Sequence, residues 1–148
     1  MKKVLISQCL IGENVRYDGG SCLVTQLNEL KEKYDLVPVC PELLAGLGVP
    51  REPIERVGDE IITKSGVEIT SSFIPAIKTI EKMIEENKIE MAIMKENSPS
   101  CGVHKVYDGS FSGVKIDGSG LISEKLRSLG LKVYSDQEIH LLLNDTCW

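Results

Sequence analysis

The sequence predicts an α/β fold in three layers, with helices on both faces of a mostly parallel sheet. Short apolar runs of strand length alternate along the chain with segments whose apolar residues recur at helical spacing. Strands that are separated by helices join through right-handed βαβ crossovers, which produce such a covered parallel sheet. The chain has 148 residues, of which 42% are hydrophobic. This is enough for one compact core, so we expect a single domain over residues 1–148.

Four segments have the composition of strands that are buried on both faces of a sheet. The sequences are KVLIS, LVPVC, MAIMK and LKVYS, at Lys3–Ser7, Leu36–Cys40, Met91–Lys95 and Leu131–Ser135. The second segment contains Pro38, which has no N–H for the strand ladder and is typical of an edge strand or a bulge.

Three helices are predicted between these strands. The middle one covers Phe73–Glu86, where Pro75 could open the helix, and the last one ends before Gly130, a candidate C-cap. The apolar positions that define the three helices are Leu23, Leu27, Leu30 and Tyr34, then Ile77, Ile80 and Ile84, then Ile122, Leu126 and Leu129.

Two segments depart from this alternation. Glu60–Thr63 and Val67–Thr70 are joined by Lys64, Ser65 and Gly66, and they predict a small β-hairpin inserted before the middle helix. The later stretch VYDGSFSGVKIDGSG, residues 106–120, is rich in Gly, Ser and Asp without a sustained period. It predicts a functional, lid-like loop.

The charge of the chain disfavours polyanionic partners. The formal net charge is −5, and the sequence contains no run of Lys and Arg, so nucleic acid or an anionic membrane surface would repel the protein. The segment MKKVLIS turns polar at once, and no run of about 18 apolar residues follows. We therefore expect a cytoplasmic protein with neither a nucleic-acid partner nor a membrane association.

Three of the five cysteines follow predicted strands. Cys9 lies two residues beyond the first strand, Cys40 closes the second, and Cys101 lies in the turn SPSCG after the third. Because the carboxyl ends of parallel strands share one edge of the sheet, we expect the three thiols to converge there. Cys22, at the predicted start of the first helix, and Cys147 are expected to be structural.

An odd number of cysteines in a reducing compartment makes a disulfide framework the weaker explanation. Metal binding, nucleophilic chemistry and plain packing remain, and a single cysteine is most often a small buried hydrophobe. Three thiolates suit a metal centre with one open position. A four-iron cluster normally takes four cysteines, so three would leave one iron open as a Lewis acid for a sulfur-bearing substrate.

Polar residues beside these cysteines could take part in such chemistry. Glu42, in the segment CPE, could act as a general base, or it could simply begin a helix. Ser98 and Ser100 offer hydroxyls, or they could form the turn. His104 is close to Cys101 in sequence but is typical of a loop residue, and His140 is typical of a packed or surface helix residue.

Four motifs, taken in order, resemble a bacterial family of small proteins that includes thiouracil desulfurase. They are SQCLIGENVRYDGG, CPELLAGLGVPREP, KENSPSCG and YDGSFSG, and they are spread over nearly the whole chain. The resemblance implies a [4Fe-4S] cluster held by three cysteines, which match Cys9, Cys40 and Cys101. It also implies removal of sulfur from a thiolated nucleobase such as 2-thiouracil, giving uracil and sulfide.

Carried over residue by residue, the resemblance makes Glu42 the catalytic carboxylate and Ser98 the catalytic hydroxyl, with Ser100 as a further candidate. The predicted reaction is non-redox: Glu42 activates water, and Ser98 positions the substrate or relays a proton. Arg16 and Asp18, with Tyr17 between them, could line the substrate pocket, or Arg16 and Asp18 could form an ordinary turn-stabilising pair.

Two other functional classes stay open. The domain could be an iron-sulfur binding or electron-transfer module without hydrolytic activity. It could also be a metal-free cysteine hydrolase, for which the sequence offers no clear constellation of Cys, His and acid.

Overall fold

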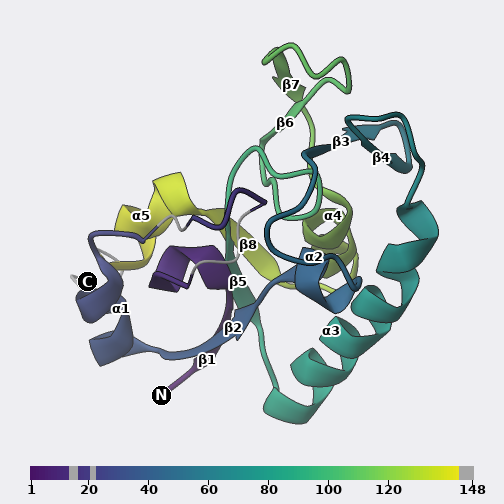
Figure 1. The fold of residues 1–148 in the computed structure, drawn as a ribbon. Coiled ribbons are helices and arrows are strands. Elements are labelled where there is room, and N and C mark those ends of the chain that lie inside the picture. The colour runs from purple at the N-terminus through teal and green to yellow at the C-terminus, as the bar shows by residue number, and fades with distance from the viewer. Residues whose placement is uncertain (14–16, 21–22, 144–148) are drawn as a thin grey trace.

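Four parallel strands form the central sheet of the protein. The computed structural model describes residues 1–13, 17–20 and 23–143. The strands are β1 (Lys3–Ser7), β2 (Asp35–Val39), β5 (Met91–Met94) and β8 (Lys132–Ser135), in the order β2-β1-β5-β8 (Figure 1). The predicted parallel sheet is confirmed. Pro38 lies in β2 at the edge of the sheet, where a missing N–H is tolerated.

Helices cover both faces of this sheet. On one face, Val4 and Ile6 of β1 pack with residues of α1 (Leu27–Lys33) and α5 (Ile139–Leu143). On the other face, Leu5 packs with residues of α3 (Phe73–Asn87) and α4 (Leu121–Ser128). Alternate residues of a strand point to opposite faces, so β1 contributes to both clusters. The predicted three-layer arrangement is confirmed.

The first helix begins later than the sequence pattern predicts. It starts at Leu27 rather than near Leu23, because the preceding segment is held by another part of the chain. The Val24 N–H donates to the carbonyl of Leu10 at 3.0 Å, in the short 3₁₀ turn η1 (Gln8–Ile11) that follows β1. At the other end of the chain, Gly130 has a φ of 90°, which agrees with its predicted place at the end of the third helix.

The predicted β-hairpin forms in part, and its first strand has a second partner that the sequence did not predict. β4 (Glu60–Thr63) pairs with the preceding strand β3 (Ile54–Val57). The two-residue turn between them has Gly58 at a φ of 59°, and a glycine at the first position of such a turn matches the twist of a hairpin. The predicted partner, residues 67–70, forms an isolated antiparallel bridge from Glu68 to Ile62, and the Thr63 and Ile69 N–H groups donate to the Val67 and Ile61 carbonyls at 2.9 Å. The chain then enters a 3₁₀ turn, η2 (Thr70–Ser72).

The Gly-rich stretch 106–120 also contains regular structure that its composition hides. β6 (Lys105–Tyr107) and β7 (Lys115–Asp117) form an antiparallel pair, so the prediction of a loop throughout is wrong. Both strands have three residues, and those of β7 are all exposed. Strands this short and exposed leave no alternation of apolar residues in the sequence. Residues 108–114 remain as the loop between them.

The strand order creates a crevice at one edge of the sheet. From β1 the chain moves to the edge strand β2, and it then returns past β1 to β5 on the other side. The direction of winding therefore reverses between β1 and β5, and ligands of such sheets bind outside the carboxyl ends at this reversal. Among the described residues, no helix has the length and apolar character needed to cross a membrane.

Candidate active site

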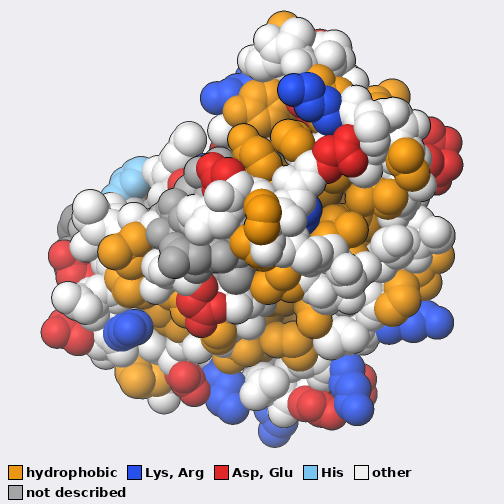
Figure 2. Space-filling model, in the orientation of Figure 1, with side chains coloured by type: hydrophobic (Ala, Val, Ile, Leu, Met, Phe, Trp, Pro, Cys, Tyr) orange, Lys and Arg blue, Asp and Glu red, His pale blue; other side chains and the backbone are white. Residues whose placement is uncertain are grey.

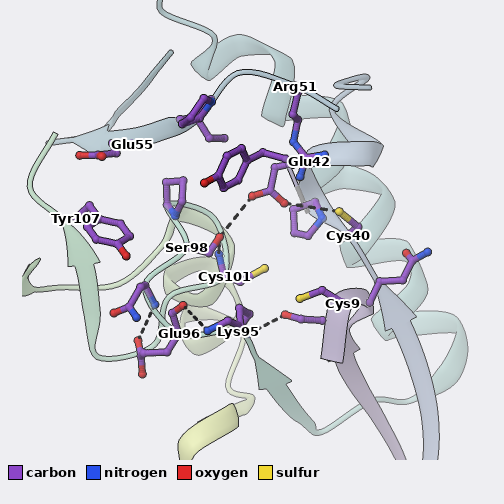
Figure 3. A pocket seen from close by; sticks show the side chains of 18 of the residues that line it. Cys9, Cys40, Glu42, Arg51, Glu55, Lys95, Glu96, Ser98, Cys101 and Tyr107 are labelled. Atoms are coloured by element: carbon purple, nitrogen blue, oxygen red, sulfur yellow. Dashed lines mark hydrogen bonds between the residues drawn. The ribbon is translucent and has the colours of Figure 1, made fainter. Parts of the chain in front are cut away.

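A cavity of about 390 Å³ lies at the carboxyl ends of the parallel strands. Cys9, Cys40 and Cys101 all line it, although they follow three different strands, and each is less than 9% exposed. In Figure 3 their sulfurs face a common space below Glu42. The structure thus brings together the three thiols that the strand ends predict.

Two of the cysteines are set by short helical turns. Cys9 lies in η1, which ends at Gly12 with a φ of 93°. Cys40 follows β2 directly and is the N-cap of α2 (Pro41–Leu44), where its carbonyl accepts the Leu44 N–H at 3.1 Å. The sequence prediction placed Cys40 within the strand; Pro41, which favours the first turn of a helix, moves it to the helix start.

Backbone hydrogen bonds to one hydroxyl shape the SPSCG turn that carries Cys101. Ser98 Oγ accepts the N–H groups of Ser100 at 3.2 Å and Cys101 at 3.1 Å. The Gly102 N–H donates to the Ser98 carbonyl at 2.8 Å. A Cβ atom on Gly102 would lie 2.6 Å from that same carbonyl oxygen, so the turn needs a glycine for this close approach.

The N-terminus of α4 holds the same turn from the other side. The N–H groups of Leu121 and Ile122 donate to the carbonyls of Pro99 and Ser100 at 3.0 and 2.9 Å. The first N–H groups of a helix have no partner within the helix, so the turn satisfies them. Ser123 Oγ also donates to the Cys101 carbonyl at 2.6 Å.

Glu42 reaches from α2 into the cavity and meets both serines of the SPSCG turn. Its Oε1 accepts the hydroxyl of Ser100 at 2.8 Å and that of Ser98 at 3.4 Å, and its Oε2 lies 3.7 Å from the Cys40 sulfur. Ser98 lines the cavity, whereas Ser100 is fully buried. The predicted carboxylate and hydroxyls therefore form one connected group, with Ser100 behind Glu42.

Burial keeps at least two of the thiols protonated. Burial, followed by the nearby Glu42 carboxylate, raises the pKa of Cys40 to about 11. Burial, then Glu42 and the neighbouring Cys9, also raises the pKa of Cys101 well above its usual range. Nucleophilic cysteines have a lowered pKa in an electropositive site, so the raised pKa values of Cys40 and Cys101 argue against activated nucleophiles and leave packing or metal ligation, in which the thiol loses its proton on binding.

The donor set fits an iron-sulfur cluster better than a single ion. Within the described residues, no three side chains of His, Cys, Asp or Glu are gathered as a single-ion site. In a four-iron cluster each thiolate binds a different iron, so the ligands are expected to stand further apart around a shared cavity. Cys9, Cys40 and Cys101 offer three soft sulfur donors around one cavity, which is the ligand chemistry that such clusters take.

The structure separates the other predicted residues. Asp18 is exposed, lies outside the cavity lining and accepts the Gly20 N–H at 2.8 Å, which is an ordinary turn contact. Tyr17, one residue earlier, does line the cavity. His104 is exposed and bonds to Glu138 at 2.7 Å, and His140 is exposed on α5. Arg16, Cys22 and Cys147 lie outside the described residues.

Two buried carboxylates at the cavity did not stand out in the sequence. They are Glu55 of β3 and Glu96 after β5, at 8% and 4% exposure, and both accept backbone N–H groups of other segments. A lone Glu in a strand-like segment is usually exposed to solvent, so nothing in the sequence indicated a role for Glu55. For Glu96 the one signal was its position in the motif KENSPSCG.

The sequence model of the 2-thiouracil desulfurase family matches residues 4–138. The chain belongs to this family. The chain is 35% identical over 150 residues to the uncharacterized protein YbbK of Bacillus subtilis (strain 168), a match that covers 95% of this chain and 99% of YbbK. The resemblance predicted from the four motifs is thereby confirmed.

Among solved structures, this member of the 2-thiouracil desulfurase family is similar to the [4Fe-4S]-dependent thiouracil desulfidase TudS. The TM-score is 0.90 and the sequence identity 35%, and the match covers 96% of this chain and 95% of that one. The arrangement of strands and helices described above is therefore shared with an iron-sulfur enzyme.

Proposed function

We propose that the protein hydrolyses the carbon–sulfur bond of a thiolated nucleobase such as 2-thiouracil and releases sulfide, using a [4Fe-4S] cluster held by Cys9, Cys40 and Cys101. The observation that carries this proposal is the convergence of three buried thiols with Glu42 in one cavity. Family membership and the likeness to TudS support it.

The cluster and the carboxylate have separate tasks. When bound, a cluster with three protein ligands supplies one iron that is open to the sulfur of the substrate and acts as a Lewis acid. Glu42 supplies the base. Its Oε1 accepts the hydroxyls of Ser98 and Ser100, and its Oε2 accepts the Cys40 thiol at 3.7 Å. Because Cys40 would lose that proton on binding iron, Oε2 is then the oxygen left to take a proton from water.

The reaction balances without an oxidant or a reductant. Water adds its oxygen to the thiocarbonyl carbon, and Glu42 takes one of its two protons. The second proton passes to the sulfur as the carbonyl forms and the carbon–sulfur bond breaks, so sulfur leaves as hydrosulfide, and Glu42 then releases its proton to solvent. The products from 2-thiouracil are uracil and sulfide. Ser100 fixes the orientation of the Glu42 carboxylate from behind, and the Ser98 hydroxyl, which lines the cavity, can contact the substrate or pass on the proton.

A metal-free cysteine hydrolase would need a thiol with a lowered pKa. The raised pKa values of Cys40 and Cys101 therefore favour the proposal over such a hydrolase. An iron-sulfur binding or electron-transfer module would not need the Glu42 carboxylate in the cavity, so the presence of Glu42 favours the hydrolytic function over such a module. Because thiols are kept reduced in the cytoplasm, we also propose that the protein works there.

Glu42→Gln tests the proposed chemistry directly. The substitution keeps the size of the side chain and an oxygen for the serine hydroxyls, but it removes the base, so we expect release of sulfide from 2-thiouracil to fall at least 100-fold. The iron content and the visible spectrum should stay those of the unaltered protein. Turnover is measured without oxygen by uracil formation.

Cys40→Ala is the matched comparison, because it removes a proposed ligand two residues away. It should lose both the cluster and the activity. Full turnover by Glu42→Gln, or full cluster content together with full turnover by Cys40→Ala, would contradict the proposal.

A further inference from the structure

The loop of residues 108–114 is held beside the cavity by a buried carboxylate that the proposed chemistry does not use. Glu55 Oε1 accepts the N–H groups of Gly109 at 2.9 Å and Phe111 at 3.2 Å. A buried carboxylate is costly unless hydrogen bonds compensate it, so these contacts stabilise both Glu55 and the loop. Glu55 also lines the cavity, and Figure 3 shows it with Tyr107 on the side away from Glu42.

The loop and the β3–β4 hairpin are closely fitted to each other. A Cβ atom on Gly109 would lie 2.2 Å from Cγ2 of Val57 in β3, so the loop backbone packs directly against that strand. Arg56, on the same strand, forms an ion pair with Glu124 of α4 at 2.7 Å. The hairpin that carries Glu55 is therefore tied to the helix that holds the SPSCG turn, and β3 lies beside β6 in Figure 1.

Phe111 has an unusual backbone conformation for a bulky residue. Its φ is 57°, in the left-handed region where a side chain with a Cβ is strained. Such strain persists only where the surroundings hold it, and it is frequent at functional sites. Here the N–H of the strained residue is itself bonded to Glu55. Phe111 is half-buried and lines the cavity together with Tyr107, and hydrophobic side chains gather below the β6–β7 lobe in Figure 2.

We propose that Phe111 is the residue on which the ring of the substrate stacks, and that Glu55 is a positioning residue that holds Phe111 in place. The inference rests on the proposed function and deepens it. A thiolated nucleobase is flat and aromatic, and it needs an apolar face on one side while its sulfur reaches the thiol-lined part of the cavity. Stacking of a base on an aromatic side chain tolerates different bases, because every base has a π-face. The substrate class is accordingly a planar thiocarbonyl heterocycle rather than a flexible thioamide.

Phe111→Gly and Phe111→Asn test the stacking contact. Both replacements remove the ring. Glycine adopts a left-handed backbone without strain, and asparagine tolerates it at little cost, so the loop conformation should be kept. We expect the KM for 2-thiouracil and the Kd for uracil, measured by calorimetry, to rise about 10- to 100-fold, the range of one lost base–aromatic contact. The kcat and the iron content should change little. Phe111→Tyr, which keeps a ring, should stay near the unaltered protein.

Glu55→Ala tests the positioning role. It should raise the KM and the Kd for uracil in the same way, and Glu55→Gln, which keeps an acceptor oxygen, should restore most of the affinity. Glu52→Ala is the matched control, because Glu52 is exposed, lies outside the cavity lining and accepts the Ser65 N–H of the neighbouring segment. It should leave both constants unchanged.

The outcomes for the two proposals can be separated. Unchanged KM and Kd in both Phe111→Gly and Phe111→Asn would overturn the stacking inference while leaving hydrolysis intact. If the cluster-loaded unaltered protein binds uracil but does not turn over 2-thiouracil, the proposed function fails, and weaker uracil binding by the Phe111 variants still supports the inference. If the unaltered protein binds neither ring, both proposals are wrong.

Discussion

Glu96 is one residue whose surroundings decide how it affects stability. Its Oε1 accepts three consecutive backbone N–H groups, those of Val103, His104 and Lys105, at 2.8, 2.9 and 3.0 Å. Burial by itself would raise the pKa of Glu96, but these donors and the Asn97 N–H together hold it below its ordinary value of 4.5. Glu96 thus fixes the segment that leads from Cys101 into β6.

This lowered pKa of Glu96 predicts a pH-dependent contribution to stability. A carboxyl whose folded pKa is below its unfolded value contributes stability above the unfolded value, and this stability is lost as the pH falls through the folded value. We expect Glu96→Gln to lower the free energy of unfolding by about 1–3 kcal/mol at pH 7. In urea unfolding the difference between the two proteins should shrink as the pH falls below 4.5. A difference that stays constant from pH 7 to below that value would contradict this account.

At the residue scale, the sequence was sufficient where a residue type is rare and its position follows a strand. The three cysteines and Glu42 could be predicted on that basis. Glu55, Glu96 and Phe111 could not, because their importance comes from contacts with segments distant in sequence. For Asp18 the sequence left two interpretations open, a place in the pocket or a role in a turn, and its carboxylate accepts the Gly20 N–H of the same turn.

Among the elements, the SPSCG turn and the N-terminus of α4 form one unit. Gly120, the N-cap of α4, donates its N–H to the Gly102 carbonyl at 2.7 Å. A Cβ atom at Gly120 would lie 2.3 Å from the carbonyl carbon of Ser100 and 2.7 Å from the Cys101 nitrogen. Neither of these backbone atoms can move without shifting the turn that carries Cys101.

Gly120→Ala tests this close fit. Gly120 is the N-cap of α4, where alanine is a poorer residue than glycine, and the forced backbone shift adds to that loss, so we expect the free energy of unfolding to fall by about 1–3 kcal/mol and the iron content of the protein to fall with it. Gly48→Ala is the control, because a Cβ atom there meets no atom within 4 Å; we expect a change within about 0.5 kcal/mol. Thermal unfolding and iron analysis of both variants decide the matter. Equal stability and iron content in Gly120→Ala and the unaltered protein would refute the close fit.

The parallel strands were predicted from short apolar runs, and the helix of residues 73–87 from apolar residues at helical spacing. Features that depend on single hydrogen bonds or turns were not predicted. The start of α1 depends on a hydrogen bond from Val24 to Leu10, and the pairing of β4 with β3 depends on the turn at Gly58. Neither contact leaves a periodic signal.

For the molecule as a whole, the strand order β2-β1-β5-β8 accounts for the site. It places the ends of β2, β1 and β5 side by side, so three cysteines separated widely in sequence line one cavity. The prediction needed only that these strands are parallel neighbours, which α/β alternation favours. The wall of the cavity contributed by β3 and β6 could not be predicted, since these short strands belong to separate two-stranded sheets.

The central claim is that this arrangement holds a four-iron cluster. The most direct test is the iron and acid-labile sulfide content of protein purified without oxygen, measured with the visible spectrum. The account predicts about four iron atoms and four sulfides for each chain. Protein that contains no iron, even after anaerobic reconstitution with iron and sulfide, would contradict it.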